Sequence, residues 1–171
     1  MSSYTLYDAS IAVVRDALDA LSNILTKAEA HPNSASFLDA RLAEDMLPFS
    51  FQVFFVTDLA QKLAARGTGA DPLDLDRTLD SFAAMQARIA LVRGVLDKVD
   101  REALNARAEA ECTVGMGPGK EVKMQVKQYV NGYVLPNVFF HTTTAYAILR
   151  KEGVQLGKQD YLESFIGQYL S

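Results

Sequence analysis

Residues 11–28 read IAVVRDALDALSNILTKA, and this stretch decides the fold. Its apolar side chains recur at alternating steps of three and four residues, while its charged side chains fall between them. The apolar positions are Ile11, Val14, Leu18, Leu21, Leu25 and Ala28. This period places them along one face of an α-helix, so the chain begins with an amphipathic helix that needs partners to cover it. Thr5 and Asp8 resemble a capping box at its start, and the Pro32 region provides a stop.

Three further stretches carry a helical pattern. The second helix is expected from near Pro48 to Gly67 or Gly69, the third from Asp74 or Asp76 to Val99, and the fourth from Gln128 to Lys151 with an interruption at Pro136. Alternation within residues 112–126 predicts a small β-hairpin, and residues 160–170 predict a short terminal helix. The sequence therefore predicts an all-α fold in one domain, residues 1–171. This fold is a four-helix bundle with a hairpin insert before the last bundle helix.

The composition fits a globular chain without a nucleic-acid or membrane partner. Hydrophobic residues make up 49% of the 171 residues and charged residues 22%, with a net charge of -4. No basic cluster provides the field that attracts phosphate backbones, and no apolar stretch approaches the roughly eighteen residues of a membrane helix. The early charged side chains argue against a signal peptide, and the single Cys112 has no intrachain partner. We therefore expect a cytoplasmic protein in which Cys112 is a spectator thiol.

His141 is the most informative position, because it interrupts the apolar stripe of the fourth helix. The stripe reads Val134, Val138, His141, Ala145 and Ile148, at steps of four and three. The same count in the second helix turns Gln52 inward, and it also places Asp45 on that side if the helix extends so far. On the fourth helix, Asn137 and Thr144 widen the polar patch.

Several interpretations of these residues remain open. His141 is either a core histidine that donates to Gln52, to a threonine or to the carbonyl freed by Pro136, or a hydrogen-bonding or acid/base group in a pocket between helices, or a metal ligand. Arg41 and Asp45 are spaced as a local ion pair, with a substrate carboxylate as the alternative partner of Arg41. We expect Asp58 to be a helix-surface acid paired with Lys62.

A family resemblance covers nearly the whole chain. Its residues are Ala40-Arg41-Leu42, Asp45-Met46, Pro48, Gln52, Leu135-Pro136-Asn137, Phe140-His141-Thr142-Thr143-Thr144-Ala145-Tyr146-Ala147-Ile148-Leu149-Arg150, Gly153-Val154 and Leu156-Gly157-Lys158. At these positions the chain resembles the family called domain of unknown function 1993, a branch of the DinB/YfiT-like superfamily. The resemblance implies an up-and-down four-helix bundle that is often dimeric. It also implies that better-known relatives hold a divalent metal with three histidines and serve in thiol-dependent transfer or hydrolysis.

The residues do not supply such a metal centre. A metal-binding member carries a second histidine four residues after the first on the last bundle helix, where this chain has Ala145, and the second-helix ligand would fall near Gln52. One imidazole and a carboxamide are too few donors for a transition metal. We therefore expect no metal and no cofactor.

Three functions follow from these observations. The first is a bundle that binds a small molecule between its helices, or a cofactor-independent isomerase or cyclase with His141 as its acid or base. Besides His141, the expected binding residues are Gln52, Asn137, Thr144, Tyr146, Phe55, Asp45 and Arg41, with Phe51 and Phe140 at the rim. The second is a non-catalytic interaction protein that forms a homodimer. The third is a divergent metal hydrolase or thiol transferase.

Overall fold

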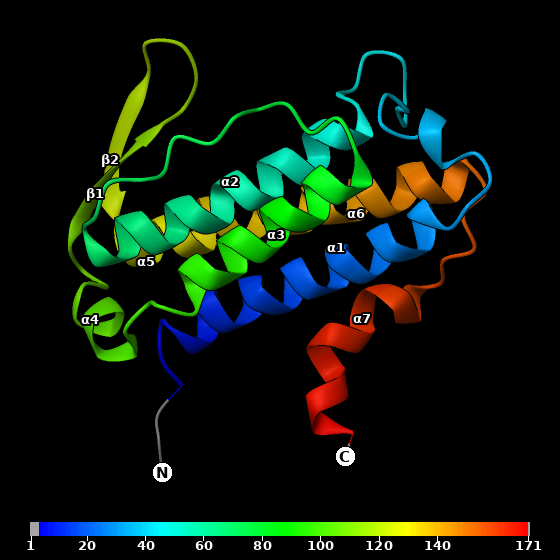
Figure 1. The fold of residues 1–171 in the computed structure, drawn as a ribbon. Coiled ribbons are helices and arrows are strands. Elements are labelled where there is room, and N and C mark those ends of the chain that lie inside the picture. Colours follow the sequence, from blue (N-terminus) through cyan, green and yellow to red (C-terminus); the bar gives the residue numbers. More distant parts are fainter. Residues whose placement is uncertain (1–3, 171) are drawn as a thin grey trace.

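The computed structural model describes residues 4–170 as a bundle of long helices with a hairpin at one end (Figure 1). The predicted capping box forms, since Thr5 N donates to Asp8 Oδ2 at 3.0 Å and Asp8 N donates to Thr5 Oγ1 at 3.4 Å. This capping box precedes a π-helical turn, η1 (Asp8–Ala12), which continues directly into α1 (Val13–Glu29).

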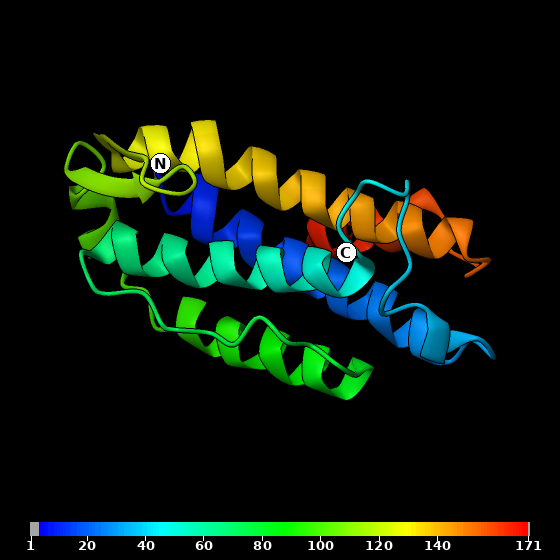
Figure 2. The same ribbon diagram turned by 90° about the horizontal axis from the view of Figure 1, so that it is seen from above.

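Four helices form the bundle: α1, α2 (Phe49–Thr68), α3 (Phe82–Leu96) and α6 (Leu135–Lys151). Seen from above, α2 lies between α3 and α6 (Figure 2). All four contribute buried apolar side chains to one core, which holds the whole predicted stripe of α1. Burial of apolar surface is the main force that holds such helices together. The predicted all-α bundle with a hairpin insert is thereby confirmed.

The third helix begins later than predicted. Residues 70–81 contain no helix, and α3 starts at Phe82 with Ser81 as its cap, whose side chain accepts from Ala84 N at 3.1 Å. This connection runs back along α2, so that α2 and α3 point the same way (Figure 1). An extended chain of this length can reach about 40 Å, whereas a helix as long as α3 spans about 22 Å, so the connection is long enough to return. Leu79 belongs to this crossover and not to the helix, although its side chain is buried.

The hairpin is present where the alternation predicted it. Strand β1 (Glu111–Gly115) pairs antiparallel with β2 (Glu121–Gln125), with Thr113 opposite Lys123. A short helix, α4 (Arg101–Ala106), precedes it and was not predicted. None of the helices in residues 4–170 combines the length and hydropathy of a membrane span.

The last bundle helix is interrupted as expected, but before Pro136. A single turn, α5 (Val126–Tyr129), leads into a π-helical turn, η3 (Val130–Val134), and then into α6, in which Pro136 occupies the first turn. Pro136 has no N–H to donate, and it follows directly on η3, where the wider π-helical bonding already departs from the regular α-helical pattern. The chain ends with α7 (Lys158–Ile166) and a 3-10 turn, η4 (Gly167–Tyr169); another 3-10 turn, η2 (Ser34–Ser36), follows α1.

Candidate functional site

His141 and Gln52 meet between α6 and α2, as the sequence predicted. His141 Nδ1 lies 2.7 Å from Gln52 Oε1, and Gln52 Nε2 donates to the carbonyl oxygen of Leu47 at 2.9 Å. Because the amide nitrogen donates to Leu47, the amide oxygen faces the imidazole, and the proton of the neutral ring sits on Nδ1. Gln52 is buried, so this hydrogen bond joins the two helices inside the bundle.

Three phenylalanines surround the imidazole. The ring of Phe55 lies 4.4 Å from it, that of Phe140 5.1 Å and that of Phe51 6.4 Å, each measured between ring centroids. Burial lowers the pKa of His141 from its ordinary value of 6.5 to about 4. Desolvation disfavours the charged form of a histidine, so this side chain is neutral across the physiological range.

The other predicted residues of α6 do not join His141 in a polar cluster. Asn137 Nδ2 donates to the carbonyl oxygen of Tyr133 at 2.6 Å, and Thr144 Oγ1 donates to that of Phe140 at 2.7 Å. Both side chains therefore bond backbone one turn earlier, Thr144 within α6 and Asn137 in the preceding turn η3. Tyr146 packs against the apolar core and is half-buried.

The condition under which Asp45 would share the face of Gln52, a helix that extends back to it, is not met. Helix α2 begins only at Phe49, so Asp45 lies in the preceding loop, where it is exposed. Arg41 is exposed too, and its Nη1 donates to the carbonyl oxygen of Met46 at 2.5 Å. No ion pair joins Arg41 to Asp45 within residues 4–170, because Arg41 bonds the loop backbone instead.

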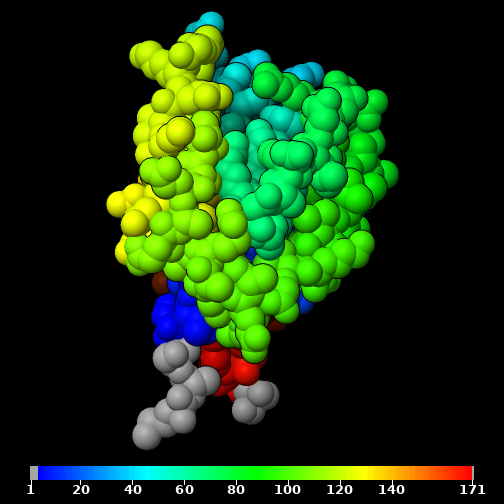
Figure 3. All heavy atoms as spheres, turned by 90° about the vertical axis from the view of Figure 1, so that its left-hand side faces the viewer, coloured from blue at the N-terminus to red at the C-terminus, as the bar shows by residue number. Residues whose placement is uncertain are grey.

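A cleft of about 480 Å3 opens beside this aromatic group, between α2, η3 and the hairpin. In Figure 3 the teal atoms of α2 lie in a hollow between the yellow-green hairpin and the green crossover. Phe51 and Phe55 line the cleft and are stacked at 5.6 Å, so the wall that contacts His141 is also a wall of the cleft. His141 itself is not one of the lining residues. These are Phe51, Phe54, Phe55, Asp58, Leu59, Lys62, Arg66, Arg77, Val114, Gly115, Met116, Gly117 and Tyr133.

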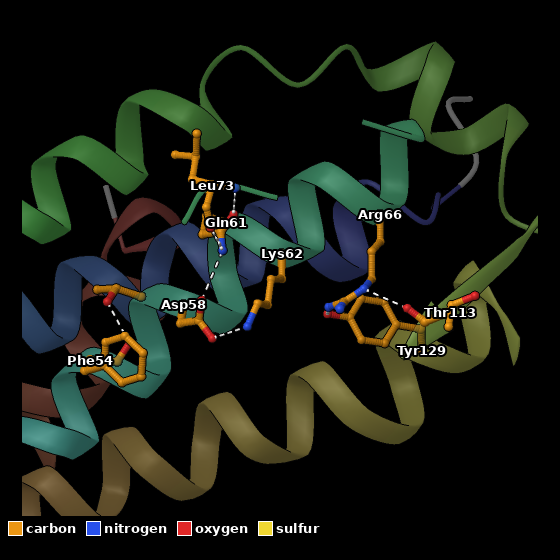
Figure 4. Close-up of polar contacts among 9 residues, drawn as sticks. Phe54, Asp58, Gln61, Lys62, Arg66, Leu73, Thr113 and Tyr129 are labelled. Carbon is orange, nitrogen blue, oxygen red and sulfur yellow. Dashed lines mark hydrogen bonds and ion pairs between the residues drawn. The ribbon is translucent and has the colours of Figure 1, made fainter. Parts of the chain in front are cut away.

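Asp58 and Lys62 form the predicted ion pair at 2.5 Å, but Asp58 is not on the surface. Gln61 Nε2 donates to Asp58 Oδ1 at 3.1 Å, and the Gln61 amide also holds the backbone of Leu73 through bonds of 2.9 and 3.2 Å (Figure 4). The crossover is thereby held against α2 and covers Asp58. Both oxygens of the buried carboxylate are thereby hydrogen-bonded, one to a cation and one to an amide donor.

Arg66 is the feature of the cleft that sequence reasoning missed. Its Nε donates to the carbonyl oxygen of Thr113 at 3.0 Å, and its Nη1 donates to the hydroxyl of Tyr129 at 2.9 Å (Figure 4). Tyr129 is fully buried, and burial raises the pKa of its phenol to about 12. Arg66 therefore links α2 to the hairpin and to α5 through neutral acceptors only. The partners lie 47 and 63 residues away, so no local spacing indicated them.

Cys112 lies close enough to this arginine to feel its charge. The side chain is half-buried, and burial raises the pKa of its thiol, although the positive charge of Arg66 opposes the shift. A thiol with a raised pKa remains protonated and is a poor nucleophile. The raised pKa supports the spectator role.

A larger hollow of about 960 Å3 lies between the start of α1 and the C-terminal segment. Most of the charged groups on its walls are already in ion pairs, since Arg101 bonds Asp8 at 2.6 Å, Arg93 bonds Asp19, and Arg15 bonds Asp97 outside the hollow. Tyr4 and Tyr169, at the two ends of the described chain, form part of its wall. Asp16 also lines it and has no ion pair within residues 4–170. The cleft beside α2 is the better candidate site because it shares its aromatic wall with the His141–Gln52 contact.

The donors present do not fit the three-histidine metal centre of the superfamily. Between residues 4 and 170, no three side chains of His, Cys, Asp or Glu come together as a metal site. Nδ1 of His141 is bonded to Gln52, and Ala145 is part of the apolar core. A transition-metal centre of that kind needs three or more imidazole or anionic donors.

Comparison with known proteins agrees with this architecture. Residues 6–162 match the family model described as domain of unknown function (DUF1993). The crystal structure of a DinB family member protein from Shewanella denitrificans is similar with a TM-score of 0.82 and 33% sequence identity, over 92% of this chain and 91% of that one. A search of curated proteins found no match. The chain belongs to the DUF1993 family, within the DinB-like branch of helical bundles.

Proposed function

We propose that this domain binds a small organic molecule, without a metal, in the cleft between α2, η3 and the hairpin. The observation that carries the proposal is the cleft itself, which has about 480 Å3 of space between stacked aromatic rings and charged side chains. Ligand sites have volumes of this order and combine a mostly apolar lining with a few fixed polar groups.

In this proposal His141 has a supporting role. A general base works best with a pKa near the working pH, and a pKa of about 4 leaves little driving force for proton abstraction. His141 instead packs against Phe55, a wall residue of the cleft, while its Nδ1–H holds Gln52. The pair thereby positions the aromatic wall and fixes the contact between α2 and α6.

The test is a fragment screen by protein-detected NMR, carried out on the wild type and on two matched variants. Phe55→Ala removes a ring from the cleft wall, whereas Phe139→Ala removes a ring from α6 that contacts Phe165 at 6.3 Å and does not line the cleft. We expect fragments to shift amide signals of α2 and the hairpin, and to bind about tenfold more weakly to Phe55→Ala only. Equal binding to all three proteins would overturn the proposal.

One observation favours a second function, that of a dimeric interaction protein. Helix α7 exposes two large apolar side chains one turn apart, with Leu162 38% and Ile166 47% accessible. Exposed apolar groups that lie together are typical of protein interfaces. Sedimentation equilibrium tests this function: we expect a homodimer that Ile166→Glu weakens, and a monomer at all concentrations would exclude the dimer.

A further inference from the structure

The charges on the cleft walls are unbalanced. Lys62, Arg66 and Arg77 line the cleft together with a single carboxylate, that of Asp58, although the chain as a whole carries a net charge of -4. Asp58 is fully engaged, because Lys62 and Gln61 bond its two oxygens. The cleft is therefore a positive region on a negatively charged protein, and such a region concentrates anions.

Arg66 is the group best placed to hold an anion. Its two protein partners, the carbonyl of Thr113 and the hydroxyl of Tyr129, are neutral, and no carboxylate pairs with it in residues 4–170. These bonds, and the position of the guanidinium 5.2 Å from the Tyr129 ring centroid, fix the side chain beside the cleft. A fixed guanidinium loses little entropy on binding and presents its remaining N–H groups as a fork that matches a carboxylate or phosphate.

The aromatic side chains further along the cleft suit the rest of such a ligand. Phe51 and Phe55 are stacked, and Phe54 and Tyr133 also line the space, so a flat apolar body finds aromatic faces within the same cleft as Arg66. Aromatic rings favour offset or edge contacts with another ring. The cleft therefore offers a charged end and an aromatic end.

We propose that the ligand is an organic anion, with an acidic group held by Arg66 and an aromatic or apolar body held by the aromatic side chains that line the cleft. This inference rests on the proposed function, because it names the class of molecule that the same cleft takes. The acidic group is a carboxylate or a phosphate, and two probes with the same aromatic body distinguish them.

The experiment is calorimetry at neutral pH with probes that share one ring system and differ in charge. Naphthalene-2-carboxylate and 2-naphthyl phosphate are the anions, naphthalene-2-carboxamide is the neutral match and 2-naphthylmethylammonium is the cation. Each is titrated into the wild type, Arg66→Gln and Lys158→Gln. Lys158 is exposed at the start of α7, outside the cleft, so its loss removes the same charge without touching the site.

We expect an anion to bind the wild type and Lys158→Gln at least about tenfold more tightly than the amide, and to lose that advantage in Arg66→Gln. The tighter of the two anions identifies the acidic group. If the amide binds as tightly as both anions, the inference is overturned while the proposed binding function stands. If no naphthyl probe binds, the inference is also overturned, and the fragment screen alone decides the binding function.

A further variant separates the charge of Arg66 from its structural bonds to the hairpin. Arg66→Lys keeps the charge, so it must bind the anion better than Arg66→Gln. An equal loss of binding in both variants contradicts the charge argument.

Discussion

Oε1 of Gln52 accepts the Nδ1–H of His141 at 2.7 Å, and this bond joins the first turn of α2 to the middle of α6. The direction of the bond follows from the other end of the amide, which donates to the carbonyl oxygen of Leu47. Gln52 therefore sets which ring nitrogen of His141 carries the proton, and it leaves Nε2 as an acceptor.

The first prediction concerns this tautomer. At neutral pH we expect the nitrogen NMR signals of His141 to show a protonated Nδ1 and an unprotonated Nε2, because Gln52 offers an acceptor only to Nδ1. Long-range nitrogen–proton correlation spectra distinguish the two tautomers. A protonated Nε2 would mean that the Gln52 amide is turned the other way.

The second prediction is a double-mutant cycle on the same pair. Gln52→Leu should reduce the free energy of unfolding by about 1 to 3 kcal/mol, because it leaves the imidazole N–H inside the bundle without an acceptor. His141→Leu should cost a similar amount, since it leaves the buried Gln52 oxygen unpaired. The double variant should recover most of the loss, because two apolar side chains can pack together. Urea unfolding measures all four proteins, and additive losses in the double variant would argue against direct coupling.

The third prediction is a pH dependence of stability. The pKa of His141 is about 4 when folded and about 6.5 when unfolded, so between these values the unfolded chain binds more protons. Its contribution to stability is therefore fully present above pH 6.5 and is lost as the pH falls toward 4. Since the side chain is only partly buried, we expect this loss to be about 1 to 2 kcal/mol.

The free energy of unfolding is measured against pH for the wild type and for the Gln52→Leu/His141→Leu double variant, which keeps all the carboxylates and serves as the reference. Parallel stability curves for the two proteins would contradict the lowered pKa.

The fourth prediction concerns metal content. Elemental analysis of untagged protein should find no stoichiometric transition metal, because His141 has neither a histidine at Ala145 nor an anionic donor at Gln52 to share an ion. A stoichiometric metal that is lost in His141→Ala would support the divergent metal hydrolase or thiol transferase instead.

The bundle helices and the His141–Gln52 contact could be predicted because both depend on local periodicity. A step of three or four residues fixes the face of a helix, and the faces of α2 and α6 are each defined by several apolar residues. The same count could not place Asp45, because it applies only within a helix and the chain before Pro48 is a loop.

The start of α3 was misjudged because burial and helix were confused. Leu79 fits the apolar period of α3 and is buried, but it lies in the extended crossover before the helix begins. Ser81 was the available signal, since serine directly before an apolar helical run is a common cap. The crossover also explains Asp58, which the spacing alone placed on the surface.

The cleft could not be predicted from the sequence. It unites residues from α2, the crossover, the hairpin and η3, and its central cation, Arg66, is held by groups far away in the chain. The π-helical turn η3 also shifts the helical period between Tyr129 and Val134, so a count along an ideal helix would misplace Tyr129.

The most direct test of the binding site is a crystal structure of the protein soaked with the tightest fragment from the screen. We predict density for the fragment in the cleft, against Phe51 and Phe55 and within reach of Arg66. Density in the hollow between α1 and the C-terminal segment, or no bound fragment anywhere, would contradict the account.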